Sequence, residues 1–204
     1  MRQARIELRQ RAAQICAALW LCIPCFVQAQ SVPERFKSIC QSCHGEGGVS
    51  TTALTPSLAG QPSFYAVTQL FLFREGRRSN PLMTAMAKGL SDSDLRAFSE
   101  YIGKLPPPPE VPMQGLIPER MARGARLTQE HRCASCHGAD FSGGKQVARL
   151  ANQREDYLLQ TLKGFQSGER LGYTTAMNET LVGIKPEGLE DMAYYLANAP
   201  RAKP

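Results

Sequence analysis

The segment Cys40-Gln41-Ser42-Cys43-His44 has the pattern Cys-x-x-Cys-His, and Cys133-Ala134-Ser135-Cys136-His137 repeats it. On a helical turn, residues three apart lie on one face, so the two thiols can each form a thioether with a vinyl group of one heme. The histidine that follows can then bring its imidazole to the iron as the proximal ligand. Each segment therefore predicts one covalently attached heme c. The predicted heme residues are Cys40, Cys43 and His44 in the first segment and Cys133, Cys136 and His137 in the second.

Two other chemistries also use paired cysteines. Two Cys-x-x-Cys pairs can form a structural zinc site, but zinc does not require the histidine that follows both pairs. A thiol–disulfide redox motif is typical of a βαβ context, and no strand-rich pattern surrounds either segment. The two complete heme motifs therefore favour a diheme protein.

The first residues have the pattern of a secretory signal. Four arginines precede an apolar run over residues 12–27, and Val27-Gln28-Ala29 supplies small residues at the spacing of a cleavage site. The sequence therefore predicts a signal peptide over residues 1–29 and export to the periplasm. The apolar run is short for a membrane span and contains Pro24, which disfavours a retained anchor.

The net charge of the chain depends strongly on this segment. Cleavage after Ala29 removes four arginines and one glutamate, so the net charge falls from +6 to +3. Heme propionates would lower it further. No basic surface for nucleic acid is therefore expected.

A longer repeat surrounds the two heme motifs and divides the chain into two units. Four consecutive prolines at 106–109 favour an extended, stiff connection between the units. We therefore expect an N-terminal domain at 30–105, a linker at 106–112 and a C-terminal domain at 113–204. Positions that recur 92 to 94 residues apart include Leu58-Ala59-Gly60-Gln61 with Leu150-Ala151-Asn152-Gln153, Tyr65 with Tyr157, Phe73 with Phe165, Met83 with Met177, and Leu95 with Leu189.

The local patterns predict an all-α protein. No segment alternates like a half-buried strand. Ser91 is a helix-capping residue followed by acidic side chains, and prolines 118 and 186 stand where a first helical turn tolerates them. The expected helices cover residues 33–43, 63–75 and 92–104 in the first unit, and in the second they begin at 118, cover 154–165 and begin again at 186.

The sixth iron ligand of a low-spin carrier heme is usually methionine or histidine. The one histidine outside the motifs, His131, lies two residues before Cys133 and is expected to be an exposed polar residue. Met83 and Met177 are matched by the repeat, and both are expected in irregular stretches before the last helix of their units. They are the candidate ligands, with Met86 as an alternative to Met83 and Met192 as a core residue.

The expected mature chain resembles the diheme cytochrome c4 family, in which two class I cytochrome c domains stand in tandem. The resemblance is carried by both heme motifs, by Pro56-Ser57-Leu58-Ala59-Gly60-Gln61, by Phe73-Arg74-Glu75-Gly76-Arg77, and by the spacing of Met83 and Met177. It implies two covalently bound heme c groups with the axial pairs His44/Met83 and His137/Met177.

The resemblance also implies a second contact for each proximal histidine. In class I cytochromes a proline carbonyl commonly orients that ring, and Pro56 matches the position in the first domain. Ala148 stands there in the second domain, from which we expect the two hemes to differ in potential.

As a function, the resemblance implies a periplasmic carrier that passes single electrons between respiratory redox partners and toward a terminal oxidase, with peripheral membrane association. No reaction of its own is expected. The alternatives are a cytochrome subunit of a periplasmic dehydrogenase complex and a diheme peroxidase, which would need one iron with an open or displaceable site.

Overall fold

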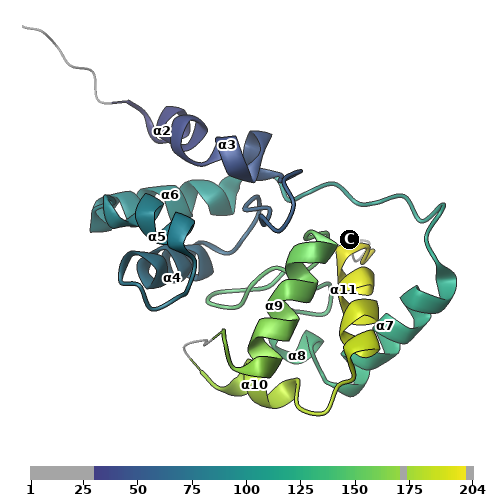
Figure 1. The fold of residues 1–204 in the computed structure, drawn as a ribbon. Coiled ribbons are helices and arrows are strands. Elements are labelled where there is room, and N and C mark those ends of the chain that lie inside the picture. Colours follow the sequence, from purple (N-terminus) through teal and green to yellow (C-terminus); the bar gives the residue numbers. More distant parts are fainter. Residues whose placement is uncertain (1–29, 171–173, 201–204) are drawn as a thin grey trace, which may run out of the picture. The chain divides into compact units, whose positions relative to one another are not determined.

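The structure, a computed structural model, describes residues 30–170 and 174–200. Within these residues the secondary structure is helical, apart from one isolated bridge between Gly144 and Val147 (Figure 1). The predicted all-α class is confirmed. The signal peptide expected over residues 1–29 lies outside the described residues and stays a prediction.

The helices follow the repeat. The first unit contains α2 (Val32–Ile39), α3 (Gln41–His44), the 3₁₀ turn η1 (Glu46–Gly48), α4 (Ser63–Arg74), α5 (Pro81–Lys88) and α6 (Asp92–Lys104). The second unit contains α7 (Pro118–Glu130), α8 (Ala134–His137), α9 (Glu155–Ser167), α10 (Ala176–Thr180) and α11 (Pro186–Ala197).

The first and last helices of the N-terminal unit are capped and tied together at their starts. Ser31 and Glu34 form a capping box on α2, and Ser91 and Asp94 form one on α6. The Asp94 carboxylate also accepts from the Arg35 guanidinium, which joins the first turn of α6 to α2. Phe36 from α2 then meets Phe98 and Ile102 from α6 and Ala66 from α4 in a small core.

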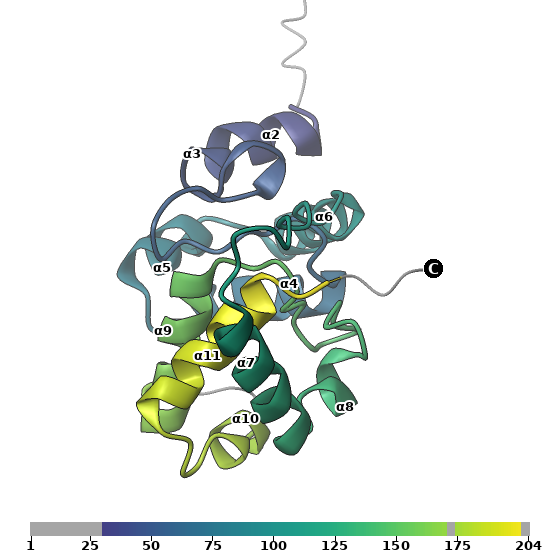
Figure 2. The ribbon, with the colours of Figure 1, turned by 90° about the vertical axis from the view of Figure 1, so that its right-hand side faces the viewer.

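The last helix of the C-terminal unit, α11, packs against both α7 and α9 (Figures 1 and 2). The approach to α7 is close at Gly124, where an added Cβ would collide with the Asp191 carbonyl and the Tyr195 Cβ. Because of this collision, a glycine is required where the two backbones come together. The buried Asp191 carboxylate also accepts from Arg120 and Arg123 on α7.

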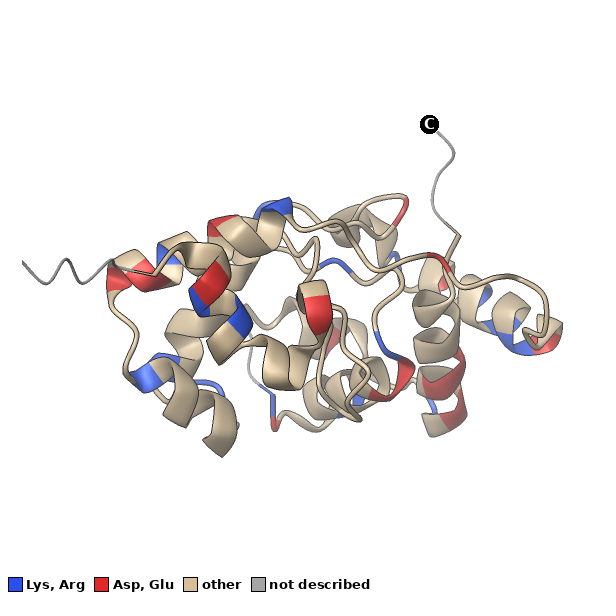
Figure 3. Cartoon of the chain, turned by 90° about the horizontal axis from the view of Figure 1, so that it is seen from above, with Lys and Arg blue, Asp and Glu red and all other residues tan. Residues whose placement is uncertain are grey.

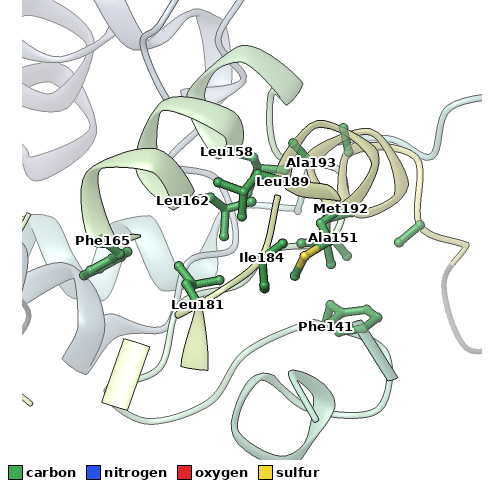
Figure 4. Packing of buried hydrophobic residues seen from close by; sticks show 13 residues of the cluster. Phe141, Ala151, Leu158, Leu162, Phe165, Leu181, Ile184, Leu189, Met192 and Ala193 are labelled. Atoms are coloured by element: carbon green, nitrogen blue, oxygen red, sulfur yellow. The ribbon is translucent and has the colours of Figure 1, made fainter. Parts of the chain in front are cut away.

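The core of the C-terminal unit lies under α11. Leu158 and Leu162 from α9 meet Leu189 and Met192 from α11, and Phe141 closes one side (Figure 4). Met192 is only 1% exposed, which confirms its assignment as a core residue.

Three of the expected helices have different boundaries, and the one expected at 63–75 ends one residue earlier, at Arg74. The single helix expected at 33–43 is interrupted at Cys40 and continues as the short α3. The amide of Cys43 bonds the Cys40 carbonyl three residues back, which tightens the chain there. The helix expected at 154–165 begins at Glu155 and continues to Ser167, where Gly168 ends it in the left-handed conformation.

The start of the predicted linker packs onto the first unit. Pro108 is buried, and a Cβ added to Gly60 would lie 2.8 Å from the Pro107 Cβ. Lys, Arg, Asp and Glu occur in both units (Figure 3). In the described part of the chain, no helix is long and apolar enough to cross a membrane.

Gly124→Ala is predicted to destabilise the C-terminal unit by about 1–3 kcal/mol, because the new methyl group must displace the α11 backbone. A loss of stability would be informative, because replacing glycine by alanine in an ordinary helix increases stability by about 1 kcal/mol. Urea unfolding of the heme-loaded protein measures the change. Arg126→Ala, at an exposed position on the same helix, is the control and should change stability by less than about 0.5 kcal/mol. A more stable Gly124→Ala variant would refute the close helix approach.

Asp94→Asn is predicted to lower the free energy of unfolding by about 1 kcal/mol at pH 7, through the damaged capping box. Hydrogen bonds from Arg35 and Ser91 hold the pKa of Asp94 well below its usual range. The carboxylate therefore stabilises the fold above the pKa of an unfolded Asp, about 3.9, and this contribution is lost as the pH falls through the depressed folded value.

The difference in the free energy of unfolding between wild type and Asp94→Asn should consequently become smaller below about pH 4 in urea titrations. Glu100→Gln, an exposed position on the same helix, is the matched control. A difference that stays constant from pH 7 to pH 3 would show that the Asp94 carboxylate does not act in this way.

Candidate heme sites

In the first unit, the α3 turn ends at His44, which is buried with 6% of its surface exposed. Its Nδ1 lies 2.8 Å from the Pro56 carbonyl oxygen. Because a carbonyl only accepts, Nδ1 carries the proton and the Nε2 lone pair is left to bind a metal. Burial lowers the pKa of His44, with the Pro56 bond opposing it, so the neutral imidazole is favoured.

The chain reverses directly after this histidine. Gly45 has φ of +80°, and a Cβ there would collide with the Val49 carbonyl. A glycine is therefore needed for the loop that returns the Pro56 carbonyl to the His44 ring.

The second unit repeats this geometry around His137. Nδ1 lies 2.8 Å from the Ala148 carbonyl, and burial lowers the pKa of His137 while the Ala148 bond opposes it. The two distances are the same, so the missing proline ring does not lengthen the bond. The expected difference in heme potential, which was derived from that missing ring, therefore has no support in this distance and stays a prediction.

The four predicted thioether cysteines form no disulfide bond in the described part of the chain. Burial raises the pKa of the Cys40 thiol to about 11 and also raises that of Cys133. Within residues 30–170 and 174–200, no three His, Cys, Asp or Glu side chains gather to hold a metal ion, and thus the four cysteines do not form a zinc cluster. Two thiols before a neutral histidine with a free Nε2 fit a covalently attached heme.

The two candidate methionines lie on short helices, so the prediction that they stand in irregular stretches was wrong. Met83 is on α5, which begins because the Asn80 side chain caps the Met83 amide and Pro81 occupies the first turn. Met177 is on α10 and packs against the C-terminal core. Met86 is also on α5, where its side chain is 42% exposed.

His131 has a different environment from the one predicted. It is half-buried at the end of α7, and its Nδ1 lies 3.1 Å from the Thr180 carbonyl, the last residue of α10. Asn178 on α10 also donates to the Phe165 carbonyl at 2.6 Å. The helix that carries Met177 is therefore tied to both α7 and α9.

Contacts between the two units form a set that the sequence did not reveal. Arg78 donates to the Tyr157 hydroxyl at 2.8 Å, and Arg170 donates to the Tyr65 hydroxyl at 3.5 Å. Burial acts to raise the pKa of Tyr157, but the charges of Arg170 and Arg78 outweigh it and lower that pKa to about 7. Arg78 and Arg170 occupy matching positions of the repeat, and so do Tyr65 and Tyr157. The arginine of each unit therefore donates to the tyrosine of the other unit.

Comparisons with known proteins match both units. Residues 27–102 match the family of cytochrome c oxidase, cbb3-type, subunit III, and residues 121–200 match the cytochrome c family. The chain is 33% identical to cytochrome c4 of Thiocapsa roseopersicina, over 69% of this chain and 76% of that protein. It is 34% identical to the thiosulfate dehydrogenase electron acceptor of Thiomonas intermedia, over 70% of this chain and 69% of that protein.

A solved structure of Acidithiobacillus ferrooxidans cytochrome c4 aligns with a TM-score of 0.68 at 28% identity, covering 79% of this chain and 99% of that one. The likeness extends through both repeats and includes relatives above 30% identity that the chain covers by more than two thirds. The chain therefore belongs to the cytochrome c4 family of diheme electron carriers and holds two covalently bound heme c groups in tandem cytochrome c domains.

Proposed function

We propose that the chain is a periplasmic carrier of single electrons in which each iron has one histidine and one methionine ligand. The first axial pair is His44 with Met83, and the second is His137 with Met177. The observation that carries this proposal is the double occurrence of a buried histidine whose Nδ1 donates to a backbone carbonyl at 2.8 Å. In each unit a methionine at the matched repeat position stands on a short helix before the last one.

The heme supplies reversible one-electron exchange at its iron. The cysteines attach the group to α3 and α8, so that it cannot dissociate between encounters. The carbonyls of Pro56 and Ala148 hold the imidazole rings in one orientation. Met83 and Met177 would hold the second position on each iron, which would raise the potential and limit rearrangement when the electron moves.

The same arrangement disfavours the peroxidase alternative. A peroxidase would need one iron whose sixth ligand leaves readily. The Met177 helix is instead held by Asn178 to α9 and by His131 to α7. We therefore propose that the chain performs no catalysis of its own.

The proposed partners are redox proteins that dock weakly, as electron-transfer partners do. A membrane terminal oxidase is the proposed acceptor. A second role, as the cytochrome subunit or acceptor of a periplasmic dehydrogenase, is favoured by the similarity to a thiosulfate dehydrogenase electron acceptor. Purification from the native membrane and periplasmic fractions, followed by identification of bound proteins, distinguishes the two roles.

Export through a signal peptide at residues 1–29 is part of the proposal and rests on the sequence pattern of that segment. The N-terminal sequence of the purified protein tests it, with Gln30 expected as the first residue. Peripheral association with the membrane is proposed for the mature chain, and release by salt would support it.

Met83→Ala and Met177→Ala are each predicted to open one iron. The reduced variant should bind carbon monoxide at one heme, and the potential of that heme should fall because methionine ligation is lost. Met86→Ala, on the same helix as Met83, is the matched control and should bind no carbon monoxide. If Met86→Ala opens the first iron and Met83→Ala does not, the ligand assignment for that heme is wrong.

His131→Ala is predicted to weaken Met177 ligation without touching the iron. The lost bond to the Thr180 carbonyl is worth about 1 kcal/mol, so urea should release Met177 from the second iron at a lower concentration than in wild type. A urea titration of the oxidised protein, followed by the absorption band of the methionine–iron bond, measures this change. Glu130→Gln, an exposed neighbour, should leave that urea concentration unchanged. An unaltered urea concentration in His131→Ala would show that this contact does not hold α10.

A further inference from the structure

The carbonyl that orients His44 belongs to a peptide group with a second partner. The Pro56 oxygen accepts from His44 Nδ1, and the amide of the same peptide, the Ser57 N–H, donates to Gln153 Oε1 at 2.7 Å. Gln153 lies in the C-terminal domain. One amide plane thus connects the proximal histidine of the first heme to a side chain of the other domain.

The second heme has the reciprocal connection. The Ala148 oxygen lies 2.8 Å from His137 Nδ1, and the amide of that peptide, the Arg149 N–H, donates to Gln61 Oε1 at 3.0 Å. Gln61 lies in the N-terminal domain and is the repeat partner of Gln153. Each domain therefore contributes a glutamine at the same repeat position, and this glutamine contacts the peptide group that orients the histidine of the other domain.

Both glutamines are held in one orientation. Gln61 is 7% exposed and Gln153 is 5% exposed. Each also donates its amide N–H₂ to the carbonyl of the residue that it contacts, Arg149 at 3.0 Å and Ser57 at 2.8 Å. These paired bonds exclude the flipped amide, because it would set donor against donor and acceptor against acceptor.

Hydrogen bonds at the two ends of one peptide reinforce each other. An acceptor at the N–H increases the negative charge on the carbonyl oxygen, which strengthens the bond from the histidine Nδ1–H. A stronger bond at Nδ1 makes the imidazole more basic at Nε2 and thus a better donor to the iron. Greater donation stabilises the oxidised iron and lowers the potential.

We propose that Gln153 tunes the potential of the first heme and Gln61 that of the second, each across the domain interface through a single peptide group. The two glutamines are positioning residues, since neither touches a heme iron ligand directly. The inference rests on the proposed histidine ligation. It makes each potential depend on the docking of the other domain. Because the Gln153 bond is the shorter of the two, the first heme should respond more strongly.

The test is a redox titration of the heme-loaded Gln153→Met and Gln61→Met variants, followed by NMR so that each heme is observed separately. Methionine has similar length but offers no amide. Gln153→Met should raise the potential of the first heme and leave that of the second unchanged. Gln61→Met should raise the potential of the second heme and leave that of the first unchanged. The expected shift is less than about tenfold in the reduction equilibrium, or under about 59 mV for one electron, because the glutamine acts one bond further out than a direct partner of the histidine.

A second readout follows the hydrogen bond itself. In the reduced, diamagnetic protein, the His44 Nδ1–H proton should move upfield in Gln153→Met, and the His137 proton should stay in place. Gln153→Glu keeps an acceptor oxygen for the Ser57 amide while repelling the Ser57 carbonyl. It should therefore not raise the first potential, although it loosens the interface as methionine does. Gln160→Met, at an exposed position, is the control and should shift neither heme.

The outcomes separate this inference from the proposed function. Crossed shifts, with each variant changing the heme of the other domain, support the inference. Shifts of both hemes in every variant, Glu included, would mean a loosened interface and overturn it, as would two unchanged potentials. A wild-type protein without histidine and methionine on both irons would instead overturn the proposed function.

Discussion

Each heme site depends on a hydrogen bond between a histidine ring and a backbone carbonyl. That bond selects the tautomer that leaves the Nε2 lone pair able to bind a metal, and it holds the plane of the ring. It also explains the local chain path, because the carbonyl must return to the ring from Pro56 or Ala148. In the first domain the return begins with a left-handed glycine, Gly45, where any side chain would strike the Val49 carbonyl. The short helical turn, the reversal and the returning loop are consequences of this one constraint.

The same peptides connect the two domains. A linker of four prolines suggests a pair of domains separated by a spacer. Instead, the side chains of Gln61, Gln153, Arg78 and Arg170 form hydrogen bonds with the other domain and join the two directly. Because these residues are repeat partners, the contact set is reciprocal. A duplicated domain thus acquired an interface in which each copy contributes to the environment of the other's histidine. In a two-heme carrier, such coupling gives the relative potentials a structural basis within the chain.

Local signals in the sequence were sufficient for most of the fold. Ser91, Pro118 and Pro186 mark helix starts that the structure confirms, since capping and the first-turn proline act within a few residues. The Asn80-Pro81 pair carries the same signal for α5 and was overlooked, whereas the five-residue α10 has no capping side chain and leaves no comparable mark. The proposed heme cysteines and histidines follow from a motif whose chemistry is contained in one helical turn.

The remaining features of the sites depend on contacts between distant parts of the chain. The partners of Gln61 and Gln153 lie 88 and 96 residues away, and no periodicity indicates them. The repeat shows that the glutamines recur but not what they touch. The environment of His131 was mispredicted for the same reason, because its partner Thr180 belongs to a helix that the sequence did not reveal.

The central claim is that both irons of the wild-type protein are closed by a histidine and a methionine. It is tested most directly by absorption spectra of the exported protein, oxidised and then reduced with dithionite, before and after addition of carbon monoxide. The account predicts two covalently attached low-spin hemes and no spectral change with carbon monoxide. Binding of carbon monoxide at either heme would contradict it, since an open iron belongs to an enzyme rather than to a carrier of this design.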